Sequence, residues 1–278
     1  MQSSKKTIAT KLLFISTTLI ILFSLTSCSL CDHQYETVFF KNTDGGIAEP
    51  IIACIHCGDN ESGYDIYNSQ TEITKNHWGG LHNRTTTYKN KKNIVFLNPK
   101  IYNDPNYLYK FVITSTVDEI VFVGEDGYEI NQIMIVVRER SNDLIIDFSN
   151  VMIESFTKVL ISQECYAGIT IRTHGNNNSL RTRNAADGRN GDNGYDASDV
   201  IYVLGDITFI AYSKITVAAG NGGNGENGGN GGNGGDAIVS KRAVSVLGDT
   251  DLADFRGGVG GRGAIKGCDG LGIRCPDD

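Results

Sequence analysis

The sequence predicts an all-β protein whose main body is a right-handed parallel β-helix, with a glycine-rich C-terminal part and a small N-terminal module. From about Val112 onward, short segments rich in β-branched and aromatic residues recur without helical periodicity. Three of these segments contain Ile120, Leu144 and Ile169, which are 24 and 25 residues apart, a period typical of one solenoid coil. The chain also has 33 Gly but only 4 Pro, which favours many tight turns. An antiparallel sandwich with coincidental spacing is the alternative.

The N-terminus has the features of an export signal. Three lysines and no acidic residue precede an apolar run at 12–25, which is long enough for a secretory signal but too short to span a bilayer comfortably. The run ends in Leu-Thr-Ser-Cys at 25–28, which resembles the lipobox of bacterial lipoproteins. The resemblance implies that residues 1–27 are removed and that the Cys28 thiol carries a diacylglyceryl group. We therefore expect an exported chain, lipid-anchored to the outer face of a bacterial membrane. An ordinary signal peptide with a coincidental Cys is the alternative.

The charge of the chain limits its partners. The formal net charge is −7, and removal of the lysine-bearing signal would make it more negative. An acidic surface argues against nucleic acid as a partner and against electrostatic binding to anionic lipid. The sequence has no second apolar run of spanning length, so the lipid is the expected contact with the membrane.

Residues 28–60 are predicted to form a small metal module. Cys31 and His33 form a C-x-H pair, and Cys54 and Cys57 form a C-x-x-C pair followed by Gly. Three thiolates and one imidazole complete a tetrahedral set for structural zinc. The pattern, over residues 31–58, resembles the C-x-H…C-x-x-C-G zinc knuckles that follow the signal in some bacterial surface proteins. A disulfide is the alternative in an oxidising exterior, although it would leave one of these three Cys unpaired.

The rest of the chain is divided by composition. We expect a spacer and first strands at 61–110, the β-helix at 111–218, and a glycine-rich repeat with a C-terminal coil at 219–278. Over residues 144–183, buried strands alternate with Asn-Val-x-Ile and Ile-Thr-Ile segments. This order resembles the rungs of bacterial carbohydrate-binding β-helix proteins related in fold to pectate lyases. The resemblance implies an extracellular polysaccharide or a host or cell-surface glycan as the ligand.

Several side chains are candidates for glycan contact. The candidates that follow strand ends in neighbouring coils, and could form a basic strip for uronate carboxylates, are Arg138, Arg140, Arg172, Arg181 and Arg183. The indole of Trp78 could stack on a pyranose ring. Solvated charges and a packed turn are the alternatives. Because no recognisable catalytic arrangement is present, we expect a non-catalytic binding or adhesion protein. A polysaccharide lyase on the same fold and a structural envelope protein remain open.

The Gly/Asn tract at 220–236 has three interpretations. It could be a disordered loop, a set of stacked extended glycine helices, or part of a calcium site that uses Asp196 and Asp236. Two similar segments about 40 residues apart, beginning at Asn193 and Asn233, favour a recurrent structural part over a linker. Cys268 and Cys275 are close enough in sequence to form a disulfide.

Overall fold

The computed structural model describes residues 35–42, 48–54, 65–67, 74–76, 82–88, 90–155 and 159–275. The chain divides into two units, one of residues 1–38 and 52–62 and the other of residues 39–51 and 63–278. Strands β1 (Tyr35–Asn42) and β2 (Ala48–Cys54) form a two-stranded sheet. The sheets, loops and pockets described below belong to the second unit. Among the described residues, no helix is long and apolar enough to cross a membrane.

Within the described residues, the second unit is built from three sheets, which we number 1 to 3. Sheet 1 contains β4 (Thr74–Asn76), β5 (His82–Tyr88), β7 (Tyr107–Ile113), β10 (Ile133–Val137), β13 (Ile161–Gln163), β16 (Ile201–Val203), β19 (Ile238–Ser240) and β22 (Ile273–Arg274). Sheet 2 contains β3 (Asp65–Tyr67), β6 (Lys92–Leu97), β8 (Glu119–Gly124), β11 (Leu144–Ser149), β14 (Ile169–His174), β17 (Ile207–Ala211) and β20 (Val244–Gly248). Sheet 3 contains β9 (Glu129–Ile130), β12 (Met152–Ser155), β15 (Asn177–Thr182), β18 (Lys214–Ala218) and β21 (Ala253–Arg256).

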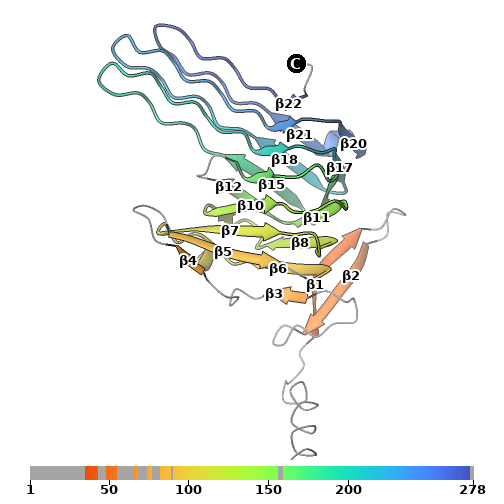
Figure 1. Ribbon diagram of the computed structural model, residues 1–278. Helices are drawn as coiled ribbons and strands as arrows, with labels where there is room; N and C mark the ends of the chain where they lie inside the picture. The colour runs from red at the N-terminus through yellow and green to blue at the C-terminus, as the bar shows by residue number, and fades with distance from the viewer. Residues whose placement is uncertain are drawn as a thin grey trace, which may run out of the picture. The chain divides into compact units, whose positions relative to one another are not determined.

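The chain visits the three sheets in turn, so the strands stack coil upon coil (Figure 1). From β7 onward, each coil contributes one strand to sheet 1, then one to sheet 2, then one to sheet 3. Neighbouring strands pair in parallel, for example β8 with β11 and β11 with β14, whereas β4 pairs with β5 antiparallel. Short helical turns, α2 (Pro99–Tyr102) and the 3-10 turn η1 (Thr250–Leu252), are the other regular elements described. The body is therefore an all-β, parallel, solenoid-like stack.

Alternating side chains place the core inside the three sheets. In β14, Ile169 and Ile171 are buried whereas Thr170 and Arg172 are partly exposed, as expected for a strand with one face against a core. Aromatic rings also stack within and between coils: Phe111 and Phe122, in β7 and β8 of one coil, have centroids 5.6 Å apart, and Phe122 and Phe148, in successive coils, have centroids 5.7 Å apart. Each coil thus covers the apolar surface of the one before it.

The predicted succession of strands is confirmed, but the predicted residue column is wrong by two positions. The strands at 119–124, 144–149 and 169–174 are successive parallel neighbours. However, Ile120 lies opposite Ile146, while Leu144 lies opposite Ile169. The coils differ slightly in length, so equal spacing in the sequence does not give the register. The parallel stack also extends beyond the predicted limits of 111 and 218, because β5 and β6 precede it and β19 to β21 continue it.

Candidate functional site

Three long loops leave the stack between sheet 3 and sheet 1 and lie side by side (Figure 1). They are loop A (183–200), loop B (219–237) and loop C (257–272), and together we name them the glycine lobe. The Gly/Asn tract is an ordered part of this structure, joined to the neighbouring loops by backbone hydrogen bonds, which favours an ordered glycine structure over a disordered loop. Loop A, which contains only three Gly between 183 and 200, was not recognised from the sequence as part of it.

A period of three residues organises the hydrogen bonds between the loops of the lobe. At one position of each triplet, an Asn or Asp side chain accepts the backbone N–H of the next loop. Asn221 N donates to Asn184 Oδ1 at 2.8 Å, and Asn233 N donates to Asp196 Oδ1 at 2.6 Å. The ladder continues upward, where Val259 N donates to Asn221 Oδ1 at 2.8 Å. We call this the ladder position.

The other two positions of each triplet also have defined backbone partners. In loop B, Gly222 N donates to the Val259 carbonyl of loop C, and Gly223 N donates to the Tyr195 carbonyl of loop A. Gly232 N donates to the Gly223 carbonyl across the two arms of loop B. Every residue of a triplet thus places its N–H against a different neighbour, which satisfies the backbone without a regular sheet.

Loop B must be glycine at the third position because loop A lies directly below it. A Cβ on Gly223 would overlap the Ala186 carbonyl, and a Cβ on Gly232 would overlap the Tyr195 carbonyl. The same holds between loop C and loop B, where a Cβ on Gly261 would overlap the Gly223 carbonyl. At this third position, the Cα–Cβ direction therefore points down toward the preceding loop.

Loop A is the first loop of the lobe, so side chains can occupy these downward positions. Where loop B has Gly220, Gly223, Gly232 and Gly235, loop A has Arg183, Ala186, Tyr195 and Ser198. The correct spacing is thus 37 residues, and the alignment of Asn193 with Asn233 suggested by the sequence is wrong by one triplet. Asn193 is instead the ladder partner of Asn230.

These side chains line a pocket of about 240 Å³ beneath loop A. Its wall contains Ser155, Arg183, Asn184, Ala185, Ala186, Tyr195, Asp196, Ala197 and Ser198. Tyr195 is 65% exposed, so its ring is available to a ligand. Arg183 Nε forms an ion pair with Glu154 Oε2 at 2.8 Å, which offsets its positive charge. We name this the underside pocket.

A second, wider groove of about 560 Å³ follows one side of the lobe. Its lining combines the ladder side chains of loops A and B with the equivalent residues of loop C: Asn184, Ala185, Ala186, Asp187, Asn221, Gly222, Asn224, Val259, Gly260, Gly261 and Arg262. Each Asn here uses Oδ1 in the ladder, as Asn224 does toward Arg262 N at 2.8 Å. We name this the lateral groove.

The five predicted arginines do not form one basic strip. Arg138 and Arg140 follow β10 of sheet 1, Arg172 lies in β14 of sheet 2, and Arg181 and Arg183 lie in or directly after β15 of sheet 3. Because the three sheets are separate faces of the coil, these side chains cannot bind one linear ligand together. Of the five, Arg183 lines the pocket described above.

Arg140 holds two coils together through main-chain carbonyls. It is buried, and its guanidinium donates to the carbonyls of Asn142 (2.6 Å), Asp143 (2.6 Å) and Val117 (2.7 Å). Burial lowers the pKa of Arg140 from its usual value. Its donors are satisfied within the chain, so its role is structural.

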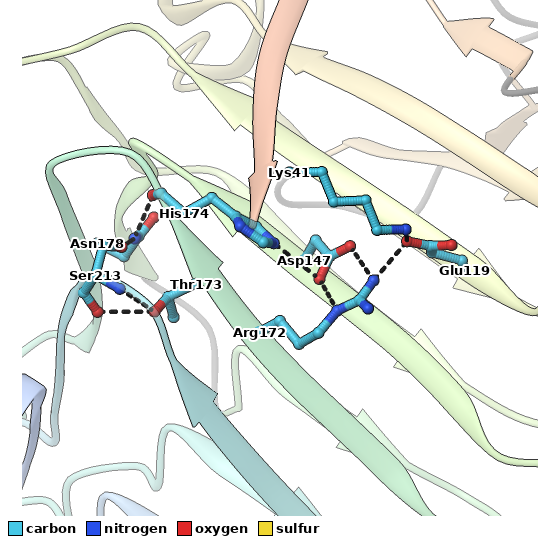
Figure 2. A network of polar contacts seen from close by, with 8 residues as sticks. All are labelled: Lys41, Glu119, Asp147, Arg172, Thr173, His174, Asn178 and Ser213. Carbon is cyan, nitrogen blue, oxygen red and sulfur yellow. Dashed lines mark hydrogen bonds and ion pairs between the residues drawn. The ribbon is translucent and has the colours of Figure 1, made fainter. Parts of the chain in front are cut away.

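Arg172 lies in a buried network on the outer face of sheet 2 (Figure 2). Its Nε lies 2.6 Å from Asp147 Oδ1, and its Nη2 lies 2.5 Å from Glu119 Oε1. Lys41 Nζ lies 2.6 Å from the same Glu119 oxygen, and His174 Nε2 lies 3.3 Å from Asp147 Oδ1. Burial alone would raise the pKa of Asp147, but hydrogen bonds from His174 and Arg172 outweigh it and hold that pKa below its usual value. The two carboxylates and two cations balance, which favours a structural role.

The remaining predicted site residues divide into two groups. Cys28, Cys31, His33, Cys57 and Trp78 lie outside the described residues, and Cys54 is described only as backbone in β2. Asp196 and Asp236 are described: each accepts a backbone N–H, and Asp236 Oδ2 lies 3.0 Å from Arg274 Nη1. Among the described residues, no three His, Cys, Asp or Glu side chains are grouped as metal ligands. This arrangement does not favour the calcium interpretation.

The predicted disulfide between Cys268 and Cys275 is not formed. Cys268 is exposed and carries a free thiol. It occupies a ladder position of loop C, where its backbone N–H donates to Asn233 Oδ1 at 2.8 Å. This contact fixes the backbone at Cys268 independently of a covalent link.

Comparison with known proteins identifies no relative: no family model, curated protein or solved structure matches the chain significantly. Sequence reasoning also missed Tyr195 and the underside pocket. A signal for loop A was present, because Asn or Asp recurs every third residue at 184, 187, 190, 193, 196 and 199. Because loop A has no glycine at the downward positions, the glycine pattern of loop B does not reveal that the two loops share a structure.

Proposed function

We propose that this chain is an exported, lipid-anchored, non-catalytic protein that binds an extracellular glycan through the glycine lobe. In this proposal, the body is a right-handed parallel β-helix held at the outer face of a bacterial membrane by Cys28. The observation that carries the glycan assignment is the underside pocket, where Tyr195 and several polar groups meet on an ordered backbone. An aromatic face together with a few fixed polar groups is the usual chemistry of a small polar ligand site.

The lobe supports this assignment because its backbone is held rigidly by ladder bonds. A ligand site on such a backbone loses little conformational entropy on binding. The polysaccharide lyase alternative gains no comparable support. Arg172, which lies in β14 of sheet 2, is paired with Asp147 and Glu119.

Glycan retention by the full exported chain tests the proposal. We expect the immobilised protein to retain at least one glycan class on an array, and Tyr195→Ala or Asn224→Asp to reduce the affinity about tenfold or more. Asn224→Asp keeps the Oδ1 acceptor of the ladder but replaces the amide donor that faces the lateral groove. Tyr128→Ala is the matched control, since Tyr128 is 53% exposed but lies outside the lobe. Absence of retention, or retention unaffected by either lobe variant, would contradict the proposal.

The anchor and the N-terminal module are proposed from sequence. Cys28 would carry the lipid, and Cys31, His33, Cys54 and Cys57 would hold one structural zinc, whose binding would be coupled to folding of the module. Native mass spectrometry of the exported chain should show a diacylglyceryl-modified N-terminus and one zinc per chain. Cys28→Ala should lose the lipid but keep the zinc. An unlipidated wild-type chain would overturn the anchor, and a metal-free module with a Cys54–Cys57 disulfide would overturn the zinc assignment.

A further inference from the structure

We propose that the C-terminal end of the stack is a docking surface for a second copy of this chain, which meets it end to end across a two-fold axis. This end is formed by the last coil, with strands β20, β21 and β22, together with loop C (Figure 1). We name it the terminal face. The inference goes beyond the proposed glycan binding, since none of the residues that carry it lines the underside pocket.

The apolar core is open at the terminal face. The inward-facing apolar side chains of the last coil are only partly buried, whereas their register partners in the preceding coil are at most 1% exposed. A coil that ends a solenoid normally presents polar groups outward, so the apolar groups here remain available to a partner. The pairs, with the last coil named first, are Val244 with Ile207, Val246 with Phe209, Phe255 with Val217, and Ile273 with Ile238.

Loop C extends this apolar surface across the glycine lobe. In loops A and B, the ladder side chain faces the next loop, as Asn193 Oδ1 does when it accepts the N–H of Asn230. Loop C instead has Val259, Ile265 and Leu271 at ladder positions. These side chains are 55, 67 and 41% exposed. They therefore form an exposed apolar row on the side of loop C that faces away from loop B.

The edges of the last strands indicate what kind of partner fits. Within the described chain, β20, β21 and β22 each pair with a neighbouring strand on one side only. Lipid chains would cover the apolar side chains, but they cannot hydrogen-bond to the N–H and C=O groups of these edges. A second copy supplies the same strand edges and the same apolar row, and a two-fold axis makes both self-complementary.

The ladder and the charges also favour this arrangement over head-to-tail stacking. Each loop of the lobe is joined to the next by side-chain oxygens at ladder positions. The ladder residues of loop C, which also include Arg262 and Cys268, carry no side-chain oxygen, so they cannot extend the ladder to another copy. Three carboxylates at the terminal face are already paired within the chain and do not repel their copies: Asp254 with Arg256, Asp236 with Arg274, and Asp269 with Lys266.

Sedimentation equilibrium of the full exported chain in density-matched detergent tests the inference. Over a wide range of protein concentration, we expect a monomer–dimer equilibrium. Ile265→Asn should raise the dissociation constant of the dimer about tenfold or more, because it removes apolar surface from both halves of the interface at once. This variant should keep the fold, since loop B has Asn230 at the equivalent position. Tyr195→Ala is the matched control, because it removes an exposed ring from loop A and should leave the dimer unchanged.

Thiol labelling distinguishes the other occupants of the terminal face. Cys268 is exposed in the same row, so a maleimide should label it more slowly in the dimer than in the monomer. A monomer at every concentration would overturn the inference. Slow labelling of Cys268 in that monomer would mean that the chain covers its own end, and fast labelling that the end is open to a different partner. A dimer unaffected by Ile265→Asn, or a series of larger oligomers, would also contradict the two-fold contact. Glycan retention by Ile265→Asn keeps this result separate from the proposed function.

Discussion

Replacement of Gly232 by Ala is expected to disrupt the glycine lobe, at a cost of about 3 kcal/mol, the upper part of the range for overpacked sites. The added methyl group would overlap the Tyr195 carbonyl. Neither backbone can move away easily, because Gly232 N donates to the Gly223 carbonyl at 2.8 Å and Gly261 N donates to the Gly232 carbonyl at 2.7 Å. Hydrogen exchange of lobe amides should accelerate in loops A, B and C together.

Two control variants distinguish the effect of the close approach between backbones from the other effects of replacing a glycine. Tyr195→Ala changes the equivalent downward position of loop A, and should leave lobe exchange unchanged. Gly228→Ala changes a tip residue with φ +99° and open space around its Cβ, so its cost should be limited to about 1–2 kcal/mol of backbone strain. If Gly232→Ala exchanges no faster than Tyr195→Ala, the close packing of the loops is not what stabilises the lobe.

The strand content could be read from the sequence because it depends on local alternation. Ile169, Thr170 and Ile171 alternate between core and exterior, and the structure keeps that alternation. Register depends instead on how many residues each turn of the coil uses. Ile120 and its partner Ile146 are 26 residues apart, whereas Leu144 and Ile169 are 25 apart, so a fixed period misplaces one of them.

The candidate site could not be predicted because it depends on contacts between loops that are far apart in the sequence. Loop B is recognisable by its glycines. Those glycines are required because their Cα atoms lie against carbonyl groups of loop A, 37 residues earlier in the chain. Loop A carries ordinary side chains at the same positions, so the glycine pattern of loop B does not identify it, and only the Asn or Asp at every third residue indicates the shared structure. In the sequence, nothing distinguishes Tyr195 from other exposed turn residues, because its place at a downward position follows only from the stacking of the loops.

Ile169→Asp is expected to unfold the solenoid-like stack. Ile169 is 1% exposed, and it lies between Leu144 of the preceding coil and Ile207 of the following coil. A carboxylate there would lose its hydration without a cation or hydrogen-bond donor to replace it. Loss of more than ~4 kcal/mol is expected from such a change, against a typical total stability of ~5–15 kcal/mol. The effect should spread, because every coil covers the apolar surface of its neighbour.

Thr170→Asp is the matched control, since it introduces the same carboxylate one residue later on the outer, partly exposed side of β14. Its cost should stay near 1 kcal/mol or below, as for most partly exposed substitutions. Urea unfolding followed by circular dichroism should show a much lower midpoint for Ile169→Asp than for Thr170→Asp. Equal midpoints would mean that Ile169 does not face a packed core. The stacking of Leu144, Ile169 and Ile207 would then not be the interaction that holds successive coils together.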